Sequence, residues 1–172
     1  MSNQYFGYGE RTPEVMGAII GRVPDYDAAV LAGFRLFTQN TVDMSEPVRN
    51  IMAINRSPEE MESSQFYVAV ASEGDHIPGL VYRGITDQEF ALVGNFDLEG
   101  LWLKLYRGRF IHIFNEDGSS TRLGDADYHA NPSGILTKPA PKFEGIFPPS
   151  LSNPERTLEI ATIARMKFLA EN

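Results

Sequence analysis

Residues 85–106 of this 172-residue chain contain the change of secondary structure that most constrains its fold. Thr86, followed three residues later by Glu89, is a capping box and predicts the start of a helix. The helix is expected to end near Gly94, and an apolar, strand-like run begins a few residues later. Glu99 therefore lies where a helix passes into a strand, either as a surface turn residue or as a half-buried acid/base.

About seven short strands are predicted from runs rich in β-branched and aromatic residues that end at turn-forming residues. They cover residues 4–8, 33–38, 65–72, 79–85, 101–106, 110–114 and 121–128. Arg107-Gly108-Arg109 is interpreted as a hairpin turn between two of them. Because turn signals join the strands, and regular strand–helix–strand alternation is missing, we expect an α+β fold. Its strands should form a mainly antiparallel sheet or a partial barrel, with peripheral helices.

Further helices are predicted from residues that cap their ends. Thr12 is placed to cap the first helix at its N-terminus and Gly21 at its C-terminus. Ser57 begins a short helix inside the irregular residues 39–64, and Ser152 or Asn153 begins the last one. This last helix is expected to pack on the sheet through an apolar stripe. The stripe consists of Ile160, Ala161, Ala164 and Phe168, widened by Leu158, Ile163 and Leu169.

The length and the composition, with 42% hydrophobic and 11% aromatic residues, indicate one globular domain spanning residues 1–172. We assign its core to residues 4–128, followed by a loop arm and a C-terminal helix in residues 129–172. The N-terminus has no basic segment followed by an apolar run, and no window is long and apolar enough to span a membrane. The expectation is therefore a soluble, cytoplasmic protein.

The formal net charge of −8, from 23 acidic and 15 basic residues, disfavours nucleic acid and anionic membranes as partners. It is compatible with a small anionic ligand held by a local group of donors. The chain has no cysteine, which excludes disulfides, thiolate nucleophiles and cysteine-based metal sites. Two acidic pairs, Asp97-x-Glu99 and Asp125-x-Asp127, have no histidine at a metal-binding spacing, so we expect no metal site.

The three histidines give little support for nucleophilic catalysis, and a G-x-S-x-G motif is missing. His112 alternates with Phe110 and Phe114, which is typical of a packed or edge histidine. His129 follows Tyr128 at the start of a predicted loop and is expected to be exposed.

Two features remain as candidates for chemistry. Gly7-Tyr8-Gly9 leads into a helix N-terminus, where backbone N–H groups suit a carboxylate or an oxyanion; the alternative is an ordinary strand-to-helix turn. Glu99 has apolar neighbours in the sequence, and an apolar environment makes a carboxyl group a better acid/base at neutral pH. These neighbours are Leu98, Leu101, Trp102 and Leu103.

The order of several short motifs resembles one known family. The motifs are Tyr5-Phe6-Gly7-Tyr8-Gly9, the helix with P-E-V-M, A-x-L-x-G-F-R-L at residues 29–36, G-L-V-Y-R-G-I-T at residues 79–86, Glu99-Gly100, and D-x-D-Y at residues 125–128. Together they are similar to the γ-glutamylcyclotransferase-like (AIG2-like) family over most of residues 5–128. The resemblance implies a small mixed β-barrel with helices, and an enzyme that needs no metal or cofactor.

The resemblance also implies a reaction and a set of site residues. A γ-glutamyl amine or peptide would cyclise to 5-oxoproline and release its amine, with Glu99 as the general acid/base. The alternative is a non-catalytic domain of this type that binds a small carboxylate ligand or a partner protein. The implied substrate-binding residues are Tyr8, Gly9, Glu10, Arg11, Trp102, Tyr106 and Tyr128.

The loop after Gly9 departs from the pattern of that family. A serine or threonine usually follows the Tyr-Gly pair, whereas Glu10 and Arg11 follow it here. Glu10 would bring negative charge toward a site for an anionic γ-glutamyl group. Arg11 could offset that charge or could bind a carboxylate itself.

Overall fold

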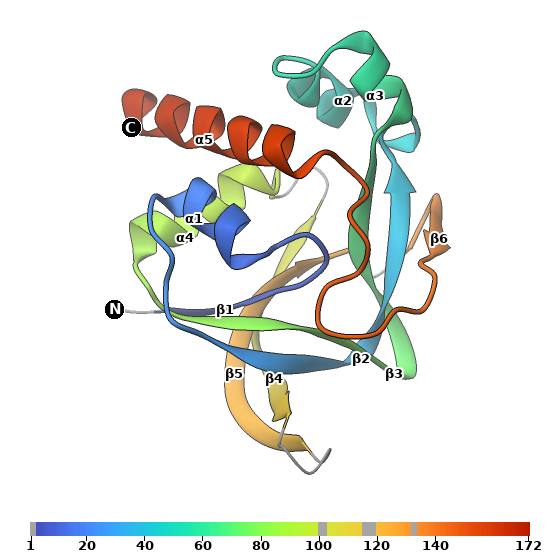
Figure 1. The fold of residues 1–172 in the computed structure, drawn as a ribbon, viewed down its shortest axis with the longest axis vertical. Coiled ribbons are helices and arrows are strands. Elements are labelled where there is room, and N and C mark those ends of the chain that lie inside the picture. The colour runs from blue at the N-terminus through green and yellow to red at the C-terminus, as the bar shows by residue number, and fades with distance from the viewer. Residues whose placement is uncertain (1–2, 100–102, 115–119, 132–133) are drawn as a thin grey trace.

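The computed structural model describes residues 3–99, 103–114, 120–131 and 134–172. Within them the fold is α+β, with helices gathered beside a six-stranded sheet (Figure 1). The strands are β1 (Asn3–Gly7), β2 (Tyr26–Asn40), β3 (Gln65–Ile85), β4 (Lys104–Phe114), β5 (Ser120–Ala130) and β6 (Thr137–Pro139). The α-helices are α1 (Pro13–Ile20), α2 (Glu46–Met52), α3 (Pro58–Ser63), α4 (Asp87–Phe96) and α5 (Pro154–Glu171), and a short 3-10 helix spans Thr41–Asp43.

The strand order is β3-β1-β5-β4-β2-β6, and β2 also pairs with β3, so that the pairings return on themselves. The pairings are antiparallel except between β1 and β5, where Tyr5 lies opposite Asp127 in parallel register. The expected α+β class with a mainly antiparallel sheet is therefore confirmed. The pairing of β1 with β5 also brings the first strand beside the last residues of β5.

Two predicted turns are absent from the described strands. The runs at residues 65–72 and 79–85 belong to the single strand β3, which pairs with β2 from Tyr26 opposite Tyr82 to Asn40 opposite Gln65. The predicted hairpin at residues 107–109 is wrong, because β4 continues through it. Its register against β5 shifts by one residue between Tyr106 and Arg109, so the glycine-containing segment forms a bulge in place of a turn.

The predicted helix starts are confirmed by the capping contacts. Four helices, α1, α3, α4 and α5, begin at residues that were predicted as N-caps. These are Thr12, Ser57, Thr86 and Asn153, each of which accepts a backbone N–H from the first turn. Of the two candidates for the last helix, Asn153 is thus the cap. Gly21 ends α1 with φ of 93°, a left-handed conformation that glycine adopts without steric cost.

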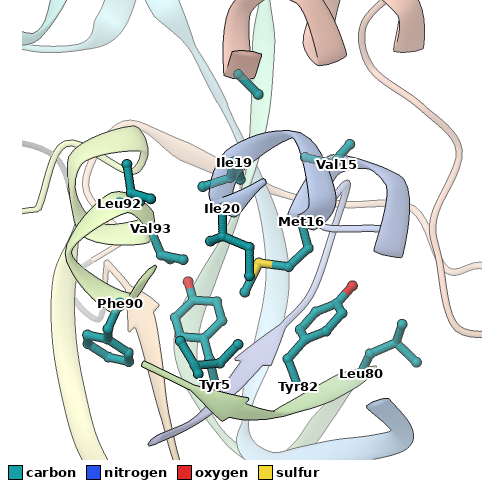
Figure 2. Packing of buried hydrophobic residues seen from close by; sticks show 12 residues of the cluster. Tyr5, Val15, Met16, Ile19, Ile20, Leu80, Tyr82, Phe90, Leu92 and Val93 are labelled. Carbon is teal, nitrogen blue, oxygen red and sulfur yellow. The ribbon is translucent and has the colours of Figure 1, made fainter. Parts of the chain in front are cut away.

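The principal core lies between two helices and two strands. α1 and α4 cover β1 and β3, and their apolar side chains meet Tyr5 and Tyr82 (Figure 2). α5 packs on the outer side of α1 and α4 (Figure 1). There Arg165 Nε donates to Ala18 O at 3.0 Å. The prediction that this helix packs on the sheet is wrong, because α1 and α4 already cover that part of it. None of the described helices is long and apolar enough to cross a membrane.

Candidate functional site

A cavity of about 700 Å³ opens beside the turn between β1 and α1. This is within the roughly 300–1,000 Å³ range of small-molecule sites. Its walls come from that turn, the α2–α3 segment, the C-terminal end of α4, the arm that leads into α5, and α5 itself. Polar side chains near the two predicted motifs line it: Tyr5, Tyr8, Glu10, Arg11, Asp97 and His129.

Asp97, at the end of α4, is the buried carboxylate of this group, with 5% of its surface exposed. Arg11 binds both of its oxygens, with Nη1 at 3.2 Å from Oδ2 and Nη2 on Oδ1, and Tyr5 donates its hydroxyl to Oδ2 at 3.0 Å. Burial alone would raise the pKa of Asp97, but the charge of Arg11 and the bond from His129 outweigh it and hold the pKa well below its usual range. The Arg11 guanidinium also lies over the Phe96 ring, 5.2 Å from its centroid.

His129 connects this carboxylate to Glu99. Its ring is 1% exposed, with Nδ1 at 3.0 Å from Asp97 Oδ2 and at 2.8 Å from the Tyr5 hydroxyl. Its Nε2 lies 3.4 Å from Glu99 Oε2. Burial alone would lower the pKa of His129, but the bond and the charge of Asp97, with the bond to Glu99, raise it. A protonated imidazole is thereby favoured between two carboxylates.

The expectation that His129 is exposed is wrong, because β5 extends to Ala130. Successive strand residues point to opposite faces, so Tyr128 and Ala130 face the core while His129 faces the cavity. The alternation of Asp127 and His129 against Tyr128 and Ala130 was the signal in the sequence. It was not recognised because the strand was expected to stop at residue 128.

Glu99 lies just beyond α4, and its N–H donates to Gly94 O at 3.0 Å. Leu98 before it has φ of 51°, the left-handed region that costs a non-glycine residue about 1 kcal/mol or more. The Glu99 side chain is 41% exposed and touches His129, while Asp97 and Leu98 line the cavity. Glu99 is not itself among the described lining residues, so its carboxylate stands beside the cavity and outside its wall.

The turn at Tyr8 and Gly9 is fixed by its neighbours. Tyr8 donates its hydroxyl to His129 O at 2.5 Å and accepts the Ala69 N–H at 3.0 Å, which ties the turn to β5 and β3. Gly9 has φ of 67°, and a β-carbon there would stand 2.9 Å from the Tyr67 side chain. Both the conformation and the close approach therefore require glycine at this position.

Glu10 binds the arm. Its Oε1 accepts the Ser150 hydroxyl at 2.6 Å, the Leu151 N–H at 3.0 Å and the Ser152 hydroxyl at 3.4 Å. The negative charge of Glu10 is therefore bound by hydrogen-bond donors of the arm. This arm forms one wall of the cavity. The sequence pattern did not indicate this role.

The remaining predicted site residues are placed as follows. Tyr106 lies on β4 opposite Tyr128 of β5. Tyr128 is fully buried in the core, edge-on to Phe34 with ring centroids 5.3 Å apart, and is not one of the described residues that line the cavity. Trp102 lies outside the described residues. No group of three or more acidic or histidine side chains within the described ranges could hold a metal ion.

Comparison with protein-family models and with curated proteins gives no match. Solved structures do match in fold. A γ-glutamyl cyclotransferase structure aligns with 82% of this chain and 73% of its own, at 14% identity and a TM-score of 0.54. Two Arabidopsis thaliana solution structures, of At5g39720.1 and At3g28950.1, are each 19% identical.

The At5g39720.1 alignment covers 99% of this chain and 87% of that protein, with a TM-score of 0.49. The At3g28950.1 alignment covers 76% of this chain, with a TM-score of 0.44, and this chain spans only 62% of that protein. The fold is thus of the γ-glutamyl cyclotransferase type, and the resemblance predicted from the sequence is confirmed for the fold. At these identities the likeness concerns the fold alone.

Proposed function

We propose that the protein cyclises a γ-glutamyl amine or peptide to 5-oxoproline and releases the amine, with Glu99 as the general acid/base. The observation that carries this proposal is the 3.4 Å contact between Glu99 Oε2 and Nε2 of His129, a residue that lines the cavity. The fold, which is that of a γ-glutamyl cyclotransferase, adds support.

The reaction needs one group that takes a proton and later returns it. Glu99 removes a proton from the substrate α-ammonium, and the freed amine attacks the γ-carbonyl carbon of the same molecule. Collapse of the tetrahedral intermediate breaks the bond to the leaving nitrogen, which receives the first proton from Glu99. The carboxylate then takes the second proton from the ring nitrogen and passes it to the released amine, which leaves as an ammonium ion. Atoms balance without water, because ring closure replaces one amide bond with another. Holding the folded conformer in the cavity supplies much of the rate enhancement.

Asp97 is poorly suited to this role, although it lies deeper in the site. Its oxygens already accept from Arg11, Tyr5 and His129, and its lowered pKa makes it a weak base. Glu99 is more exposed, and among the described residues its carboxylate contacts His129 alone at hydrogen-bonding distance. We therefore assign proton transfer to Glu99 and the positioning of His129 to Asp97.

The turn at Tyr8 and Gly9 would hold the other end of the reacting group. Backbone N–H groups at a strand-to-helix turn suit a carboxylate or the oxyanion that develops on the γ-carbonyl. Tyr8 contacts β5 at His129 O, so the turn and the proposed acid/base meet at one residue.

A second function, the binding of a small carboxylate without catalysis, is favoured by one observation. The Glu99 carboxylate is 41% exposed and stands outside the described lining of the cavity. A domain that only binds a carboxylate would hold it in the cavity by the cationic side chains of the wall. Glu99 would then have no role.

The test is a panel of γ-glutamyl dipeptides and γ-glutamyl amines assayed for 5-oxoproline. We expect turnover of at least one substrate, and a loss of two or more orders of magnitude in kcat for Glu99→Gln, in the range typical of a removed general acid/base. Glu73→Gln, at an exposed position of β3, is the matched control and should retain full activity. Ligand binding without 5-oxoproline from any substrate would favour the binding function, and unchanged turnover in Glu99→Gln would exclude the mechanism.

A further inference from the structure

Arg56 is a cation in the cavity wall that has no partner of opposite charge among the described residues. It lies between α2 and α3, half-buried, with its guanidinium over the Phe66 ring at 5.6 Å from the centroid. Its bond to protein is weak, since Nη1 donates to Met52 O at 3.4 Å. A guanidinium carries five N–H donors, so most of its capacity is unused.

The neighbouring charges do not compensate Arg56. The carboxylate of Glu60 is held by Arg156, with Nε at 3.0 Å from Oε2, and by the Ser57 N–H at 3.0 Å. Burial lowers the pKa of Arg56, the charge of Glu60 opposes this shift, and the nearby Arg156 adds to it. A half-buried guanidinium surrounded in this way is stabilised by an anion that enters from solvent.

The other charged groups of the cavity wall are engaged or exposed. Arg11 is paired with Asp97, and Glu10 accepts three bonds from the arm. Lys167 and Glu171 are exposed on α5. Arg56 is therefore the group in the described wall that is best placed to select an anionic ligand.

Arg56 and the proposed acid/base flank the same apolar cluster. Leu98, which precedes Glu99, packs together with Phe66 against Met52 and its neighbours. Arg56 stacks on Phe66 from this cluster, and the cavity wall includes both Leu98 and Arg56. A ligand whose reacting end lies near His129 can thus extend along apolar surface toward the guanidinium. Ile51 and Ile54 beside it are 38% and 63% exposed, which leaves apolar area to cover.

From this arrangement we infer that Arg56 binds an anionic group on the leaving amine, so that the preferred substrates are γ-glutamyl conjugates of apolar amino acids. The α-carboxylate of the leaving amino acid pairs with Arg56, and its side chain covers the Ile51 and Ile54 surface. The inference rests on the proposed cyclisation for the meaning of "leaving amine", but the anion site itself does not require turnover.

The experiment compares γ-glutamyl-leucine with γ-glutamyl-3-methylbutylamide, which has the same apolar group without the carboxylate. Turnover is measured as 5-oxoproline release, and binding is measured by calorimetry on the wild type, on Glu99→Gln and on Arg56→Met. Arg49→Met, on the exposed side of α2, is the matched control. Arg56→Lys keeps the charge without the planar fork, and thermal unfolding of each variant checks that it is folded.

We expect the wild type to favour γ-glutamyl-leucine by about tenfold or more in kcat/KM, mainly through KM. A preference of this size is expected from a hydrogen bond to a charged group. Arg56→Met should remove this preference and leave the amide substrate unaffected, and Arg56→Lys should retain part of it. If no substrate turns over but γ-glutamyl-leucine binds in an Arg56-dependent way, the cyclisation fails and the anion site stands. Equal affinity for both compounds in the wild type, or binding of neither, overturns the anion site whatever the turnover.

Discussion

Gly94 lies so close to Glu99 that a β-carbon on the glycine would stand 2.7 Å from the Glu99 Oε2 atom. The obstructing atom is the far end of a flexible side chain, which can move away at small cost. Gly94→Ala therefore displaces the carboxylate without disturbing the backbone, and alanine in a helix is more stable than glycine by roughly 0.5–1 kcal/mol. The variant separates the position of Glu99 from the integrity of the fold.

We expect Gly94→Ala to keep or raise the free energy of unfolding while turnover of a γ-glutamyl substrate falls at least tenfold. Urea unfolding and the 5-oxoproline assay measure the two effects on the same sample. Gly17→Ala in α1, where the new β-carbon would meet the Val23 side chain at 3.0 Å, is the matched helix control. Full activity in Gly94→Ala would show that the observed position of the carboxylate has no part in catalysis.

The pair between Arg11 and Asp97 should contribute strongly to stability because both side chains are largely buried, with 13% and 6% of their surfaces exposed. Asp97→Asn leaves the guanidinium buried without a charged partner and is expected to cost about 3 kcal/mol of unfolding free energy. A double-mutant cycle with Arg11→Met, followed by urea unfolding, measures the coupling. The exposed pair of Arg83 with Asp27 is the comparison and should couple by less than about 1 kcal/mol.

His129 should make stability depend on pH above its unfolded pKa of about 6.5. Because its pKa in the folded protein is raised, its contribution is complete below the unfolded value of about 6.5 and is lost as the pH rises through the folded pKa. The unfolding free energy of the wild type should fall over that range, and His129→Gln should lose this slope. Denaturant unfolding at a series of pH values is the measurement. The exposed His76 on β3 supplies the control, since a His76→Gln variant that lost the same slope would contradict the assignment.

Glu10 should hold the arm in place through the three bonds that its Oε1 accepts. Glu10→Ala removes the acceptor, so we expect the Leu151 amide to exchange with solvent at least tenfold faster. Glu10→Gln keeps a neutral acceptor and should have a smaller effect, because bonds to charged acceptors are stronger. Amide hydrogen exchange followed by NMR tests this, and protection of Leu151 that persisted in Glu10→Ala would show that other contacts fix the arm.

Local signals in the sequence were sufficient wherever a structure depends on neighbours along the chain. Thr12, Thr86 and Gly21 cap their helices as expected, because capping bonds join residues three or four positions apart. The order of motifs likewise led to the correct fold type. The glycine at residue 108 was misinterpreted, since the same local composition serves a hairpin turn and a bulge, and only pairing with β5 distinguishes them.

The residue types and their order thus determined the helix ends, the α+β class and the choice of Glu99 as a candidate acid. The tertiary structure alone decided what surrounds that carboxylate. Arg11 closes on Asp97 from 86 positions away, and His129 bonds to Tyr5 from 124 positions away. The burial of His129 beside Asp97 also depends on β5 ending two residues later than expected. The bond between Tyr5 and His129 follows from how β1 and β5 pair, and no periodicity within either strand specifies that pairing.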